Sequence, residues 1–135
     1  MRAMGINWLA VLVAGVAVYA VGFVIYGVVL DQATWMAASR ISAEEMAAVG
    51  TSRLPFSPVM PLVTAAAMAV LFKWAKVSGA ANGITWGALI AIVSALPAIW
   101  YGWVYGVGDG TIEVIDSLHL LIGHTVAGAI LASWK

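Results

Sequence analysis

The stretch AMGINWLAVLVAGVAVYAVGFVIYGVVL, residues 3–30, contains no charged side chain. A helix needs about 20 mainly apolar residues to cross the hydrocarbon core of a bilayer. The run is much longer than the apolar segment of a secretory signal peptide, roughly 7–15 residues, and no small-residue cleavage site follows at the right distance. It therefore predicts a retained membrane-spanning helix.

The composition of the whole chain supports a membrane location. Of 135 residues, 64% are apolar and 9% are charged, and the mean hydropathy is +1.02. Soluble domains carry about 25% charged residues. Six basic residues balance six acidic ones, so no nucleic-acid partner is expected, and the absence of cysteine excludes disulfides and thiolate chemistry. We expect a single integral membrane domain over residues 1–135, with the lipid bilayer as its main partner.

Hydropathy predicts an all-α, four-helix transmembrane bundle. The four spans are expected at residues 7–30, 59–75, 84–105 and 112–134. Residues 31–57 form the long loop. Within it, Ser42 followed by Glu45 is a capping-box pattern, and Gly50 is a typical helix stop, so a short helix is predicted at residues 43–49.

The charges divide between the two sides that four spans would create. One side receives Arg2, Lys73, Lys76 and Lys135 and no acid, whereas the other receives every Asp and Glu with only Arg40 and Arg53. The positive-inside rule then places both termini in the cytoplasm.

Small residues recur along the third and fourth spans in the pattern that permits close helix packing. In the third span Gly83, Gly87, Ala91 and Ala95 are four residues apart, and in the fourth Gly123 and Gly128 are the candidate packing positions. These stripes fit either a contact within the chain or a contact between chains. We expect a homo-oligomer. Similar motifs end the odd-numbered spans and the even-numbered spans. They suggest two helical hairpins in parallel orientation, with chance similarity among apolar helices as the alternative.

Pro97 lies inside the third predicted span and removes one backbone hydrogen bond. We expect a kink just before it. The freed carbonyl would be satisfied by Ser94 or a neighbouring helix, or would line a polar path.

The fourth span carries three ionisable residues, Asp116, His119 and His124, which are costly in lipid and often functional. Asp116 and His119 are one turn apart and could share a hydrogen bond, whereas His124 points about 140° away from His119. The histidines therefore lack the i, i+4 spacing of a metal pair, and no metal site is predicted. Haem would need two chains, so no cofactor is expected.

Three function classes compete for this sequence. In the first, Asp116, His119 and His124 pass protons, an ion or a small solute, with polar help from Thr64, Thr85 or Ser94. In the second, the chain is a non-catalytic structural or accessory protein whose histidines only bond neighbouring helices. The third, a membrane enzyme, is disfavoured because no convergent catalytic set can be assembled. We expect translocation.

The motifs INWLAVLVAGVAVYAVGFVIYG at residues 6–27, TWM at residues 34–36 and GAILASWK at residues 128–135 resemble a widespread bacterial family of small four-helix membrane proteins. That family has no known activity. The resemblance implies four spans in the bacterial inner membrane and no particular reaction. Members often have an aromatic residue near the position of His119, which argues against a proton role shared by the whole family.

Overall fold

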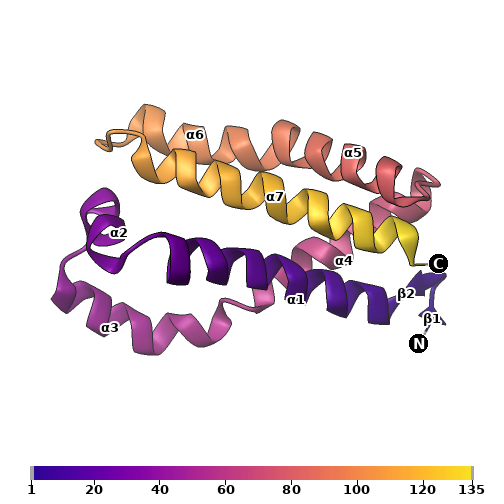
Figure 1. The fold of residues 1–135 in the computed structure, drawn as a ribbon, viewed down its shortest axis with the longest axis horizontal. Coiled ribbons are helices and arrows are strands. Elements are labelled where there is room, and N and C mark those ends of the chain that lie inside the picture. Colours follow the sequence, from indigo (N-terminus) through magenta and orange to yellow (C-terminus); the bar gives the residue numbers. More distant parts are fainter. Residues whose placement is uncertain (1, 135) are drawn as a thin grey trace.

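Four long helical rods run side by side, and both ends of the chain lie at one end of this bundle (Figure 1). The computed structural model describes residues 2–134, apart from the side chains of Val49 and Thr51. Four helical segments in this part of the chain are long and apolar enough to cross a membrane, namely Trp8–Val29, Leu54–Trp74, Ala80–Tyr105 and Thr111–Ser133. The predicted all-α fold is confirmed.

The elements follow one another in a simple order. They are β1 (Arg2–Ala3), β2 (Ile6–Asn7), α1 (Trp8–Val24), the π-helical turn η1 (Ile25–Val29), α2 (Gln32–Ser39), α3 (Ala43–Arg53), the 3-10 turn η2 (Leu54–Phe56), α4 (Val59–Trp74), α5 (Ala80–Ile90), the π-helical turn η3 (Ala91–Ala95), α6 (Leu96–Tyr105) and α7 (Thr111–Ser133). The strands form a small antiparallel hairpin that pairs Arg2 with Asn7 and Ala3 with Ile6.

Helix α7 lies at the centre of the packing. It contacts α5 and α6 on one side and α1 and α4 on another, while α1 also packs against α4. The buried core is built from Val11, Ala14, Ala65, Met68 and Phe72 with their neighbours. Large apolar side chains such as Val16, Val63 and Val93 are exposed on the outside of the bundle, as a lipid-facing surface requires.

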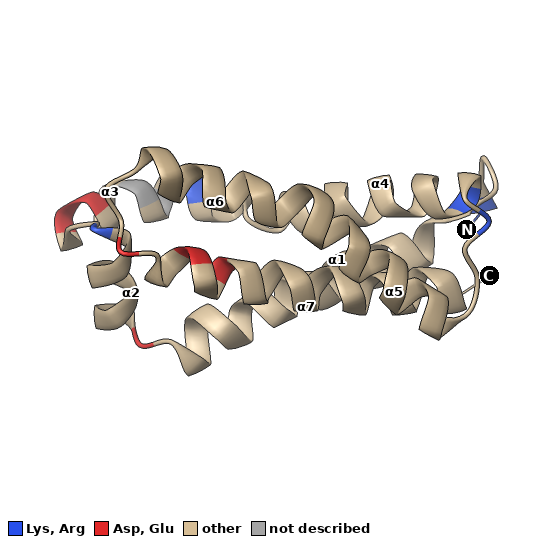
Figure 2. Cartoon of the chain, turned by 90° about the horizontal axis from the view of Figure 1, so that it is seen from above, with Lys and Arg blue, Asp and Glu red and all other residues tan. Residues whose placement is uncertain are grey.

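Charge separates the two ends of the bundle (Figure 2). We call one the basic end, defined by Arg2, Lys73 and Lys76, and the other the acidic end. The acidic end is defined by Asp31, Glu44, Glu45, Asp109 and Glu113, together with Arg40 and Arg53. Lys135, which the sequence also assigns to the basic end, lies outside the described residues.

The third span begins earlier than the sequence predicts. α5 starts at Ala80, four residues before the expected start, because Gly79 turns the chain with a φ of +86°. The amide of Gly79 donates to the carbonyl of Ala132 at 2.9 Å, which ties this turn to the end of α7. Hydropathy missed the first turn because Asn82 is polar, but its side chain donates to the carbonyl of Ser78.

The long loop at the acidic end contains two helices rather than one. The predicted capping box is present, since the Glu45 amide donates to the Ser42 hydroxyl and the Ser42 amide donates to the Glu45 carboxylate. The prediction that Gly50 ends the helix is wrong, because α3 continues to Arg53 and ends just before Pro55, which has no amide proton to continue it. Helix α2, whose start is capped by Asp31, was not predicted.

Acid should loosen the starts of α2 and α3. The side-chain hydrogen bond from Thr34 lowers the pKa of Asp31, and the backbone hydrogen bond from Ser42 lowers the pKa of Glu45. A carboxylate whose pKa is lower in the folded state stabilises that state at neutral pH, and this contribution is lost as the pH falls below about 4. We expect the helical chemical shifts of residues 32–34 and 43–45 to weaken below that pH in NMR spectra. In the Glu45→Gln variant, the start of α3 should become insensitive to pH; an unchanged titration would contradict this assignment.

Candidate functional site: a one-sided cavity between three helices

One face of α7 carries ionisable and apolar side chains at intervals of four residues. Ile112, Asp116, Leu120 and His124 follow this spacing, and His119 lies about 60° to one side of Asp116. The arc from His119 through Asp116 to His124 is therefore about 140° wide. The two histidines point apart, as predicted, yet a cavity that spans this arc is lined by both of them.

That cavity, which we call the vestibule, lies between α1, α4 and α7 and has a volume of about 980 Å³. Side chains from α2 and α3, including Trp35 and Met46, line it near the acidic end. Val18, Thr64 and His124 line it about halfway along the bundle. The structure thus brings the three predicted polar residues of α7 to one cavity near the acidic end.

Asp116 accepts a hydrogen bond from the phenol of Tyr26, across the gap between α7 and α1. Tyr26 belongs to the π-helical turn η1, and such turns are frequent at functional sites. The predicted hydrogen bond between Asp116 and His119 is absent from the described residues, because Tyr26 takes that place. Tyr26 was not predicted as a site residue, although it belongs to the first of the family motifs.

His119 packs against the backbone of α1. Its ring meets that of Tyr26 edge to face, with centroids 5.3 Å apart. A Cβ atom at Gly22 would lie 2.9 Å from Nε2 of His119, so Gly22 leaves the space for this ring. The carbonyl of Val18 lies near the ring but outside hydrogen-bonding geometry, and the buried Nε2 has no partner among the described residues.

His124 is the one polar side chain that is buried among the residues described, with 7% of its surface exposed. Its Nδ1 lies 2.7 Å from the carbonyl of Leu120, so Nδ1 carries the proton and donates. In the neutral ring Nε2 is then an acceptor, and it has no hydrogen-bond partner within residues 2–134. A residue that lines the vestibule therefore has a nitrogen lone pair without a partner in the described chain.

The other polar residues named in the sequence-based predictions fall into two groups, one that lines the vestibule and one on the outside of the bundle. Thr64 lines the vestibule. Thr85 and Ser94 are exposed on the outside of the bundle, where they donate to carbonyls of their own helix. Ser94 donates to the carbonyl of Ile90 at 2.6 Å, beside the π-helical turn η3, which ends two residues before Pro97. A proline in a helix frees the carbonyl four residues before it, here that of Val93, so this hydrogen bond does not satisfy it. Pro97 does not line the vestibule.

The small-residue stripe of α5 is occupied within the chain. A Cβ atom at Gly83 would overlap the carbonyl of Gly128, and one at Gly87 would overlap the carbonyl of His124. Ala91 is also buried, but Ala95 is only half-buried, because the wider π-helical turn rotates it away from α7. On α7, Gly123 faces Val18 of α1, so this helix packs closely on two sides.

Below the vestibule the bundle is apolar and closed. Ala14, Ala65 and Ala127 are completely buried, and Met68 is 1% exposed. We call these four residues the barrier. No polar side chain belongs to the buried core cluster that contains them, within the described part of the chain.

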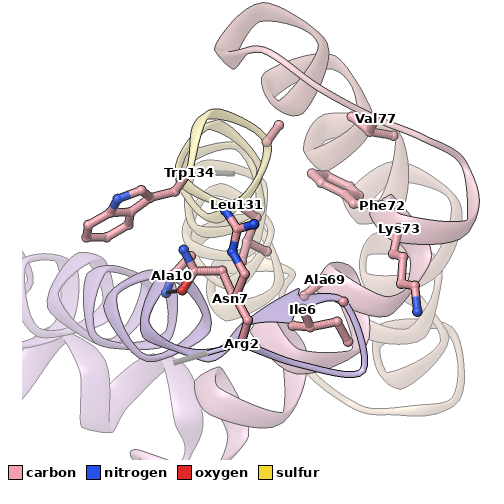
Figure 3. A pocket seen from close by; sticks show the side chains of 12 residues that line it. Arg2, Ile6, Asn7, Ala10, Ala69, Phe72, Lys73, Val77, Leu131 and Trp134 are labelled. Carbon is pink, nitrogen blue, oxygen red and sulfur yellow. Dashed lines mark hydrogen bonds between the residues drawn. The ribbon is translucent and has the colours of Figure 1, made fainter.

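A second, smaller cavity of about 220 Å³ lies on the other side of the barrier, at the basic end (Figure 3). Arg2 extends toward Leu131 at the end of α7, whereas Lys73 points away from Arg2. Lys73 donates to the carbonyl of Met4 at 2.6 Å. The two cations do not converge on one point, so this cavity offers no evident anion site. The bundle thus has a cavity at each end and an apolar barrier between them.

The arrangement limits the chemistry that this site can perform. Among residues 2–134, no group of three or more His, Asp or Glu side chains lies close enough to share a metal ion. What the vestibule presents is a carboxyl group held by a phenol and two imidazoles at increasing depth. These groups can bind, release and pass protons, and they can accept hydrogen bonds from a solute.

Four helices that are long and apolar enough to cross a membrane, with a cavity between three of them, define a small polytopic membrane protein. The chain belongs to the family described as protein of unknown function (DUF1761), whose profile matches residues 9–132. The predicted membership in a family of unknown function is confirmed. Searches of curated proteins and of solved structures found no match.

Proposed function

We propose that this protein translocates protons, together with a small solute that occupies the same vestibule. The observation that carries the proposal is the position of Asp116 and His124 on one cavity that reaches from the acidic end to the barrier. In lipid, ionisable groups that face a cavity are functional candidates. His124 lines the vestibule about halfway along the bundle, and its Nε2, which has no hydrogen-bond partner among the described residues, supplies an acceptor.

The barrier defines what a transport cycle would have to change. In this conformation protons can reach His124 from the acidic end only, because the barrier separates the vestibule from the cavity at the basic end. Translocation therefore requires a movement of α1 or α4 that opens the contact around Met68. By the positive-inside rule we place the acidic end outside and the basic end in the cytoplasm of a bacterial inner membrane.

Leucine at position 124 should abolish proton flux. The variant His124→Leu removes the titratable ring, while the carbonyl of Leu120 keeps its helical hydrogen bond. We expect proton uptake into liposomes under a potassium-diffusion potential to fall to the level of protein-free liposomes, as read by a pH-sensitive dye inside. The matched control Thr125→Val removes a hydroxyl that only bonds the carbonyl of Ile122 in its own helix. It should keep the wild-type flux.

The second candidate is a structural or accessory protein, which the apolar, closely packed core around the barrier favours. Its histidines would serve only to fill space between helices. If wild type and folded His124→Leu both show the flux of protein-free liposomes, translocation is refuted and the accessory function is favoured. We assign no enzymatic activity and no cofactor in either case.

Self-association stays a prediction. The stripe of Gly83 and Gly87 that suggested an oligomer is already covered by α7 within the same chain. An oligomer would therefore have to use one of the exposed apolar faces, such as the one that carries Ile92 and Val93.

A further inference from the structure

The vestibule has a distinctive combination of charge and aromatic side chains. Its lining includes two carboxyl groups, Asp31 and Asp116, and no Lys or Arg among the described residues. Asp31 lies beyond the end of η1, toward the acidic end, and Asp116 lies deeper between α1 and α7. The formal charges that line the cavity are therefore all negative, which favours the binding of a cation and disfavours that of an anion.

Aromatic rings line the same cavity on its α1 side. Tyr19, Phe23 and Tyr26 are spaced three to four residues apart, so they lie on one face of α1 and η1, and Trp35 of α2 adds a fourth ring. The negative face of an aromatic ring attracts organic cations. Phe23 is 64% exposed to the surroundings of the bundle, so packing alone does not require a ring there.

Two further groups that line the vestibule can accept from or attract a bound molecule, the imidazole of His124 and the carboxyl of Asp116. His124 is nine-tenths buried, and its Nε2 has no hydrogen-bond partner among the described residues. A neutral acyl chain would bring no positive charge toward this lone pair or toward the Asp116 carboxyl, whose Oδ1 accepts only from the neutral phenol of Tyr26 in the described chain. A small inorganic cation would find few oxygen ligands in a cavity lined mainly by apolar side chains.

We propose that the vestibule is the binding site of a hydrophobic monovalent organic cation, with Asp116 as the counter-ion and Tyr19, Phe23, Tyr26 and Trp35 as aromatic walls. This inference rests on the proposed function, because it names the chemical class of the solute. The volume of about 980 Å³ is that of a site for a drug-sized molecule. The cation would enter past Asp31 and stop at the barrier.

The test uses two probes of equal shape and opposite charge, tetraphenylphosphonium and tetraphenylborate. Equilibrium dialysis of the purified full chain in dodecyl maltoside should show one saturable site for tetraphenylphosphonium and none for tetraphenylborate. Asp116→Asn should weaken binding at least about 30-fold. Glu44→Gln removes an exposed carboxylate of α3 that does not line the vestibule and should leave the Kd unchanged. The proposal is overturned if both probes bind equally, or if Asp116→Asn binds tetraphenylphosphonium with the Kd of the wild type.

Phe23→Leu provides a second variant in case Asp116→Asn does not fold. It keeps an apolar side chain but removes a ring from an exposed position, and it should weaken tetraphenylphosphonium binding about 2- to 30-fold. Unchanged binding of this variant would exclude Phe23 as part of an aromatic wall and would count against the proposed site.

Cysteine labelling separates this inference from the proposed function. Because the chain has no cysteine, Thr64→Cys and Val63→Cys each supply a single thiol, one in the vestibule and one on the exposed outer face. A charged thiosulfonate should react with Thr64→Cys only, and tetraphenylphosphonium should block the reaction. If Thr64→Cys is labelled but tetraphenylphosphonium neither blocks the reaction nor binds, the proposed ligand class is overturned. The open vestibule then still stands. Failure to label Thr64→Cys contradicts the open vestibule and therefore both proposals.

Discussion

Gly83→Ala is expected to lower the free energy of unfolding by about 3 kcal/mol or more. The added methyl group would overlap the carbonyl of Gly128 and lie 2.7 Å from the Cβ atom of Ala132. These are backbone atoms and a short side chain of α7, so no flexible group can move aside. The two helices must separate, and close approach is the main source of helix association in lipid. The loss can be measured by unfolding the purified protein with sodium dodecyl sulfate and following helicity by circular dichroism.

Gly102→Ala is the matched control, because it makes the same chemical change in α6. A Cβ atom there would have no neighbour within 4 Å. Alanine has the higher helix propensity, by about 1 kcal/mol in an exposed helix, so this variant should be neutral or slightly stabilised. Equal effects of the two substitutions would show that the contact between α5 and α7 is looser than described.

Met68→Ala is expected to turn the barrier into a leak. Met68 is the largest fully buried side chain of the described chain, and its removal would leave a cavity between the vestibule and the pocket at the basic end. Removal of a buried Met side chain costs about 2–5 kcal/mol, so the variant should also be less stable. We expect proton uptake into liposomes to exceed that of the wild type under the same potential.

Met68→Leu serves as the control for this substitution. It nearly conserves volume, so it should cost less than about 1.5 kcal/mol and leave the proton flux unchanged. A folded Met68→Ala protein with wild-type flux would mean that the barrier lies elsewhere or is closed by other residues. This outcome would leave the role of His124 open to its own test.

The candidate site could be predicted from the sequence only in part. Asp116, His119 and His124 stand out because ionisable residues are rare in apolar spans. The interval of four residues from Ile112 to His124 was present in the sequence and indicates one face. Tyr26 and Gly22 could not be assigned to it, because nothing in α1 by itself shows which residues of α7 it meets 90 or more positions later in the chain.

The helix boundaries show the same division. The end of α3 follows from Pro55, and the start of α2 follows from the side chain of Asp31, so both were accessible from local chemistry. The early start of α5 was not accessible from local chemistry, because the turn at Gly79 is held by a hydrogen bond to Ala132, near the C-terminal end of α7. A window of hydropathy contains no information about such a partner.

Length, hydropathy and charge order are properties of the chain read in one dimension, and they were enough to determine four apolar helices with an acidic and a basic end. Which side chains share a cavity depends on how the helices are rotated against one another. That rotation is decided by close contacts such as those between Gly83 and Gly128 and between Gly22 and the ring of His119. Because steric fit acts between surfaces in three dimensions, only the tertiary structure could place Tyr26 on Asp116 and open a vestibule beside them.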